Sequence, residues 1–205
     1  MINPNFVIIG VLLQVIGAWS YLVDTIKGKI KPNKVSWLLW SIAPLIAFAA
    51  MVKQGVGITA LATFIVGFAP LVIFIASFLN KDAKWEISKL DIVCGTLSII
   101  GLLLWMITKV GNVAIFFSIL ADGLAAIPTI VKSYKFPETE NSMVFSFGVL
   151  NSVIALLALS EWNFQSYGFP LYLLFLDFAI ATLIQYKWGL KLQKKVESSR
   201  HNRPK

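Results

Sequence analysis

The chain has 205 residues, of which 58% are hydrophobic and only 14% are charged, and its mean hydropathy is +0.78. Soluble domains are about 45–50% apolar and about 25% charged, so the composition excludes a soluble globular protein, a disordered chain and a disulfide scaffold. The one cysteine, Cys94, allows no internal disulfide and no multi-cysteine metal site. We therefore expect no metal and no cofactor.

Seven stretches of the chain are long and apolar enough to form membrane-spanning helices, which need about 20 mostly apolar residues each. They cover residues 5–26, 35–52, 57–79, 90–107, 112–133, 142–160 and 167–186. We therefore predict an all-α integral membrane protein with seven transmembrane helices. No basic segment precedes the first stretch, so we expect it to be a retained helix and not a signal peptide.

The formal charge of +8 is distributed unevenly along the chain. Of the 18 Lys and Arg residues, only Lys53 and Lys109 fall in the second, fourth or sixth loop; the other 16 lie in the odd-numbered loops and the tail. The positive-inside rule then predicts a cytoplasmic C-terminus and an outside N-terminus. Because the lysines set orientation, we expect the lipid bilayer as a partner, no nucleic acid, and a location in the plasma (inner) membrane.

A shift of 108 residues aligns the first two stretches with the fifth and sixth. Matched pairs include Ala18 with Ala126, Lys27 with Lys135, and Asn33 with Asn141. The alignment predicts a 3+1+3 architecture, with a triple-helix repeat at 1–82, a linker helix at 83–110, a second repeat at 111–188 and a basic tail at 189–205. Parallel repeats of this kind are typical of transporters with a substrate site between them near the membrane midplane.

The fifth stretch and its following loop carry a recognisable motif. Segment 125–134 (AAIPTIVKSY), followed by the polar turn at 140–142, resembles a PQ-loop repeat, with Thr129 at the position of the motif's Gln. Ser20 and Tyr21 occupy the Pro-Gln positions of the first repeat. The chain is similar to the superfamily of SWEET sugar transporters and PQ-loop (MtN3-like) amino-acid transporters. The resemblance implies alternating-access transport of a small sugar or amino acid, with the N-terminus outside.

Four strongly polar side chains lie near the centres of otherwise apolar stretches: Gln14, Asp122, Asn151 and Asp177. An ionisable group inside a span costs about 2.5–3.5 kcal/mol on insertion scales, so it is by default a candidate for function. We predict that these four residues bind a small-molecule substrate. The carboxyl groups also suit a proton or a cationic substrate group, which makes proton-coupled transport a hypothesis. The alternative for Gln14 and Asn151 is a hydrogen bond that joins two helices without binding a ligand.

Trp40 is the fifth predicted substrate-binding residue, because its ring can stack on a sugar or cover an amine. We expect Trp19 and Trp37 to anchor the protein at the cytosolic interface instead. In SWEET-type transporters helix prolines act as hinges, and the resemblance implies this role for Pro44 and Pro128; static kinks are the alternative.

The sequence contains no Gly-x-Ser-x-Gly elbow and no cluster of metal ligands, so we predict that the protein is not an enzyme. An intramembrane aspartyl protease built on Asp122 and Asp177 would need a Gly-x-Gly-Asp pattern, which is missing at both. The main alternative to a transporter is a seven-helix receptor or sorting protein that binds without transport. Vitamin carriers of the nicotinamide riboside type are a further alternative. The oligomeric state is not predicted by the sequence.

Overall fold

The computed structural model describes residues 2, 6–53, 60–79, 81–83, 85–108, 111–159 and 161–192. These residues form seven α-helices, two short 3₁₀-helices, a further helical segment at 188–192 and no strand. The helices are α1 (Val7–Ile26), α2 (Lys34–Lys53), α3 (Ala60–Ala76), η3 (Lys81–Ala83), α4 (Lys89–Ile107), α5 (Gly111–Lys135), η4 (Pro137–Thr139), α6 (Met143–Leu157) and α7 (Phe164–Tyr186). Each predicted stretch coincides with one α-helix. The predicted boundaries at 5, 57 and 160, together with Lys109 and His201, lie outside the described residues.

Four helical segments are long and apolar enough to cross a membrane: α1, α4, Ile115–Lys135 of α5, and α7. Three further apolar segments are shorter, namely Lys34–Ala49, Thr63–Ala76 and Met143–Leu157. The outer surface is apolar as well, since Ile92, Leu103 and Ile107 of α4 are all exposed. Soluble monomers rarely expose a continuous apolar face of this kind. Together these features indicate a membrane protein.

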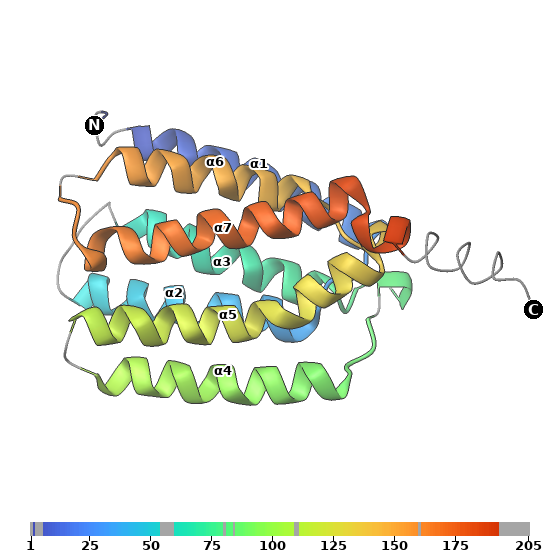
Figure 1. Ribbon diagram of the computed structural model, residues 1–205, viewed down its shortest axis with the longest axis horizontal. Coiled ribbons are helices and arrows are strands. Elements are labelled where there is room, and N and C mark those ends of the chain that lie inside the picture. Colours follow the sequence, from blue (N-terminus) through green and yellow to red (C-terminus); the bar gives the residue numbers. More distant parts are fainter. Residues whose placement is uncertain are drawn as a thin grey trace, which may run out of the picture.

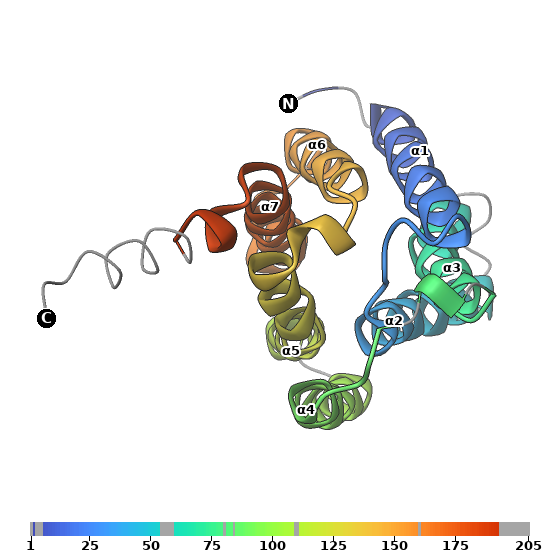
Figure 2. The same ribbon diagram turned by 90° about the vertical axis from the view of Figure 1, so that its right-hand side faces the viewer.

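The helices form two groups of three that face each other, with α4 beside α5 (Figure 2). In the first group α3 contacts both α1 and α2, and in the second group α7 contacts both α5 and α6. The groups meet along two seams, one where α1 packs on α6 and one where α2 packs on α5. This arrangement leaves a space between the groups that is lined by residues from six helices.

The loops that follow α1, α3 and α5 all lie at one end of the bundle, where α7 also ends (Figure 1). We call it the lysine-rich end, because the segments there include Lys27, Lys29, Lys81, Lys135 and Lys187. The helix α1 begins at the opposite end (Figure 1). Charge is therefore polarised along the helix axes, as it is in a protein that crosses a membrane.

Side-chain caps fix where α4 and α7 begin. Ser88 and Asp91 form a capping box, in which the Asp91 carboxylate accepts from the Ser88 backbone N–H at 2.6 Å. Asn163 accepts from the Ser166 N–H at 3.0 Å and caps α7. Such caps satisfy backbone donors that the first helical turn leaves free. At its other end α7 is terminated by Lys187, whose φ of 51° is left-handed.

Candidate functional site

A cavity of about 120 Å³ lies between the two groups of helices. Its polar and aromatic lining comes from α1, α2, α5, α6 and α7 and comprises Gln14, Trp37, Trp40, Asp122, Phe145, Phe169 and Asp177. A water molecule needs roughly 10–15 Å³ of such space, so the cavity has room for several waters or a small solute. The remaining lining residues are apolar, among them Pro44, Val66 and Leu173.

The structure brings four of the five predicted substrate-binding residues to this cavity: Gln14, Trp40, Asp122 and Asp177. The fifth, Asn151, is not part of the lining but contacts it, because its Nδ2 donates to Gln14 Oε1 at 2.7 Å. Gly10 leaves the room that this contact needs, since a Cβ there would overlap with the Asn151 side chain. Asn151 is thus placed to orient Gln14 in the cavity wall.

The two aspartates have different surroundings. Asp122 accepts a hydrogen bond of 2.8 Å from the Tyr172 hydroxyl, which ties α5 to α7. The Asp177 carboxylate packs on Gly148 of α6, where a Cβ would overlap with it. No side chain or backbone group of the described residues donates a hydrogen bond to Asp177. The Asp177 side chain is only partly buried and lines the cavity, so water, a proton or a cation there can satisfy its carboxylate.

Aromatic rings form one wall of the cavity. Trp40 meets Trp37 edge to face at 5.3 Å and Phe145 at 6.4 Å between ring centroids. The buried Trp40 Nε1–H has no hydrogen-bond partner within the described part of the chain. Because a buried donor without an acceptor is unfavourable, this N–H is available to an acceptor atom of a ligand. Trp40 can therefore contribute both a ring face and a hydrogen bond.

The expected interfacial position of Trp37 is wrong. Trp37 is only 3% exposed, lines the cavity and donates from Nε1 to the Tyr21 hydroxyl at 3.2 Å. It packs there because Tyr21, Trp40 and Phe145 surround its ring. Trp19, in contrast, is 66% exposed on the outer surface, where an anchor would lie.

A buried polar cluster separates the cavity from the lysine-rich end. It consists of Tyr21, Lys132 and Glu140, which are 0%, 1% and 6% exposed. Lys132 Nζ donates to Glu140 Oε1 at 2.6 Å, and the Tyr21 hydroxyl donates to Glu140 Oε2 at 2.6 Å. The Lys132 ammonium also donates to the backbone oxygens of Lys31 and Thr139. We call this set the Tyr21–Glu140–Lys132 cluster.

The cluster joins the two groups of helices. Tyr21 and Lys31 belong to the first group and its loop, whereas Lys132 and Glu140 belong to the second. Through Tyr21 it continues to Trp37 in the wall of the cavity. Sequence reasoning missed this cluster, because Lys132 was counted among the orienting lysines. The sequence signal that could have indicated the ion pair is the spacing of Lys132 and Glu140, which lie eight positions apart on the two sides of a short loop.

The two prolines predicted as hinges lie in different surroundings. Pro44 of α2 lines the cavity, and Pro128 is buried within α5. Proline removes one helical hydrogen bond and permits a kink, and α5 changes direction in its C-terminal third (Figure 1). Next to Pro128, Thr129 donates to Ser36 Oγ at 2.8 Å, and Ser36 donates to the Ala125 oxygen at 2.5 Å. The hinge role of both prolines stays a prediction.

Comparisons with protein-family models, with curated proteins and with solved structures give no match. Fold and site alone therefore define the class: an all-helical protein with membrane-long apolar helices and, between two three-helix groups, a cavity that contains two aspartates.

Proposed function

We propose that the protein is a seven-span membrane transporter for a small polar solute of the sugar or amino-acid class. The observation that carries this proposal is the cavity, which places two carboxyl groups between two separately packed three-helix groups. Ionisable residues inside a membrane protein are rare and mark substrate or ion pathways. In alternating access the two groups rock around such a site and expose it to one side of the membrane at a time.

Capping contacts support the 3+1+3 repeat on which the mechanism depends. Asn33 Oδ1 accepts from the Val35 N–H at 3.1 Å, and Asn141 Oδ1 accepts from the Met143 N–H at 2.7 Å. Each asparagine also donates from Nδ2 to an aspartate of another helix. Asn33 and Asn141 are 108 positions apart, and so are Val35 and Met143. Equivalent positions thus make the same side-chain contact near the beginnings of α2 and α6.

The two seams between the groups also use equivalent positions. Where α1 crosses α6, Gly17 packs on the backbone of Val144. Where α5 crosses α2, the Ala125 oxygen accepts from Ser36. Gly17 and Ala125 are 108 positions apart, and so are Ser36 and Val144. Small residues at helix crossings allow close approach in membranes, and their recurrence favours two parallel repeats.

The distribution of lysines places the lysine-rich end in the cytoplasm and the N-terminus outside in this proposal. The Tyr21–Glu140–Lys132 cluster then lies on the cytoplasmic side of the cavity and closes it there. Opening that side requires Tyr21 to separate from Glu140, because the two residues belong to different groups. In this proposal the arrangement corresponds to a form that is closed toward the cytoplasm.

The cavity chemistry suits a substrate that carries donors and at least one acceptor. Asp122 and Asp177 accept from ammonium or hydroxyl groups, and the free Trp40 N–H donates to a carboxylate or hydroxyl oxygen. When no cationic substrate is present, a proton can compensate a carboxylate in the apolar interior. Proton coupling through these two aspartates is therefore part of the proposal.

Uptake into proteoliposomes tests the proposal directly. Labelled sugars, amino acids and nicotinamide riboside are offered with and without a pH gradient, to the wild type and to Asp122→Asn and Asp177→Asn. We expect uptake of one class and its loss in both variants, whereas Glu138→Gln, at an exposed position of η4, serves as the matched control. Unchanged uptake and unchanged pH dependence in both aspartate variants would refute the assigned site. Ligand binding without flux would instead favour the receptor.

A further inference from the structure

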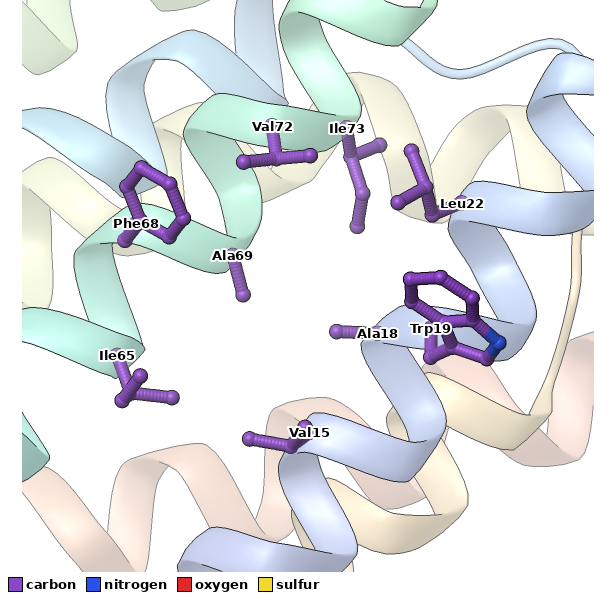
Figure 3. A pocket seen from close by; sticks show the side chains of 9 residues that line it. All are labelled: Val15, Ala18, Trp19, Leu22, Ile65, Phe68, Ala69, Val72 and Ile73. Atoms are coloured by element: carbon purple, nitrogen blue, oxygen red, sulfur yellow. The ribbon is translucent and has the colours of Figure 1, made fainter.

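An apolar groove of about 260 Å³ runs between α1 and α3 (Figure 3). Ala18 and Ala69 point into the space between the helices and form its floor, while Val15, Trp19 and Phe68 form an exposed rim. The groove exists because two alanines face each other where larger side chains would fill the space. Apolar spaces of this kind are not filled by water but do bind apolar ligands.

Along the helix axes, the groove lies within the thickness of one leaflet of a bilayer, counted from the lysine-rich end. Along α1 it extends from Leu22 to Val15, and α1 ends at Ile26. At 1.5 Å per residue the groove therefore begins about 6 Å and stops about 16 Å from the lysine-rich end of this helix. Half of the hydrocarbon core is about 15 Å thick. An acyl chain of the leaflet at the lysine-rich end can thus lie in the groove along its length.

Positive charge is available at the same end of both helices. Lys27 caps α1 and is exposed, and Lys29 follows it with a side chain that is 64% exposed. Lys81 is exposed in η3, directly beyond α3. Lysines at the membrane surface attract anionic lipid headgroups. Of these three, Lys29 lies 3.7 Å from the Asp24 carboxylate, so Lys27 and Lys81 are the better partners for a phosphate.

We propose that this groove binds one acyl chain of an anionic phospholipid, whose phosphate is held by Lys27 and Lys81. The site lies outside the central cavity and uses none of its residues. It requires only that α1 and α3 face lipid, and so it is independent of whether the protein transports a solute.

Native mass spectrometry of the purified full chain tests the proposal, with dioleoyl phosphatidylglycerol and dioleoyl phosphatidylcholine as probes. We expect the wild type to retain one phosphatidylglycerol in preference to phosphatidylcholine. Ala69→Phe fills the groove and should abolish retention, whereas Ala179→Phe adds the same ring at an exposed position of α7 and should not. Removing both lysines in Lys27→Gln/Lys81→Gln should weaken phosphatidylglycerol binding about 30-fold.

Three results would overturn the proposal: equal retention of the two lipids by the wild type, full retention by Ala69→Phe, or full retention by the double lysine variant. A wild-type dimer that Ala69→Phe converts to a monomer would also overturn it, because the groove would then hold a second copy of the chain. Size-exclusion chromatography shows whether Ala69→Phe is folded. If it is not, the double lysine variant, altered only at exposed positions, decides the question.

Discussion

Replacing Glu140 by Gln is the most informative single change in the Tyr21–Glu140–Lys132 cluster. The substitution keeps the size of the side chain and removes the charge that faces Lys132 at 2.6 Å. Lys132 is 1% exposed and so cannot turn to solvent without moving the helices around it. It retains the backbone oxygens of Lys31 and Thr139 as acceptors. The variant therefore contains a buried ammonium group that keeps hydrogen bonds but has lost its directly paired carboxylate.

Removing one partner of a buried ion pair costs about 3–5 kcal/mol. Because Lys132 keeps two carbonyl acceptors, we expect the lower end of this range, about 3 kcal/mol, which corresponds to roughly a 150-fold change in the equilibrium constant of unfolding. The charge that is left alone is the cause of this loss. We therefore expect Lys132→Met in addition to Glu140→Gln to recover at least half of it, since apolar replacements of buried pairs are often neutral.

The assay is denaturant unfolding of the purified protein in detergent micelles, followed by tryptophan fluorescence. The set comprises the wild type, both single variants, the double variant and Glu138→Gln as an exposed control. Non-additivity of the two single changes measures the pairing of Glu140 with Lys132. Two results would show that the side chains do not form a buried pair. One is a free energy of unfolding for Glu140→Gln that lies within about 1 kcal/mol of the wild-type value. The other is a loss in the double variant that equals the sum of the losses in the two single variants.

Gly148→Ala places a methyl group where the Asp177 carboxylate lies, so we expect a folded protein with reduced uptake in proteoliposomes; undiminished uptake would show that this carboxylate position is unimportant. Asn141→Ala removes the acceptor of the Met143 N–H and the donor to Asp24, and it should lower the free energy of unfolding by about 1 kcal/mol, measured by the same denaturant titration. Tyr172→Phe leaves Asp122 without its hydrogen bond and should lower the free energy of unfolding by about 1–3 kcal/mol. An unchanged unfolding midpoint in either variant would contradict the corresponding contact.

The positions of the helices follow from hydropathy, because an apolar stretch of about 20 residues has few alternatives to a helix in a membrane. The residues around the cavity are predictable for a related reason. Gln14, Asp122 and Asp177 are polar side chains inside apolar stretches, and such groups avoid lipid by facing the interior of the bundle. The structure brings all three to one cavity.

Pairings between distant segments could not be predicted in this way. A lysine after a span is interpreted as a surface charge, and nothing near Lys132 in the sequence shows that Tyr21 and Lys31 cover it. Aromatic residues near the end of a span are equally ambiguous, because the interface and the core both accept them. Trp37 and Trp19 illustrate this: one is buried beside Tyr21 and the other is exposed.

The helix α4 contacts α5 more extensively than it contacts α2. Ser98 donates to the Ala121 oxygen of α5 at 2.6 Å, and Gly101 allows close contact at the same residue. Toward α2, Gly95 meets the side chain of Val35, and the main polar tie is the bond between the loop residue Asn33 and Asp91 of α4. A rocking motion would therefore carry α4 along with α5. The moving bodies would be four helices against three, and the bond between Asn33 and Asp91, at the lysine-rich end, would have to break or follow the motion.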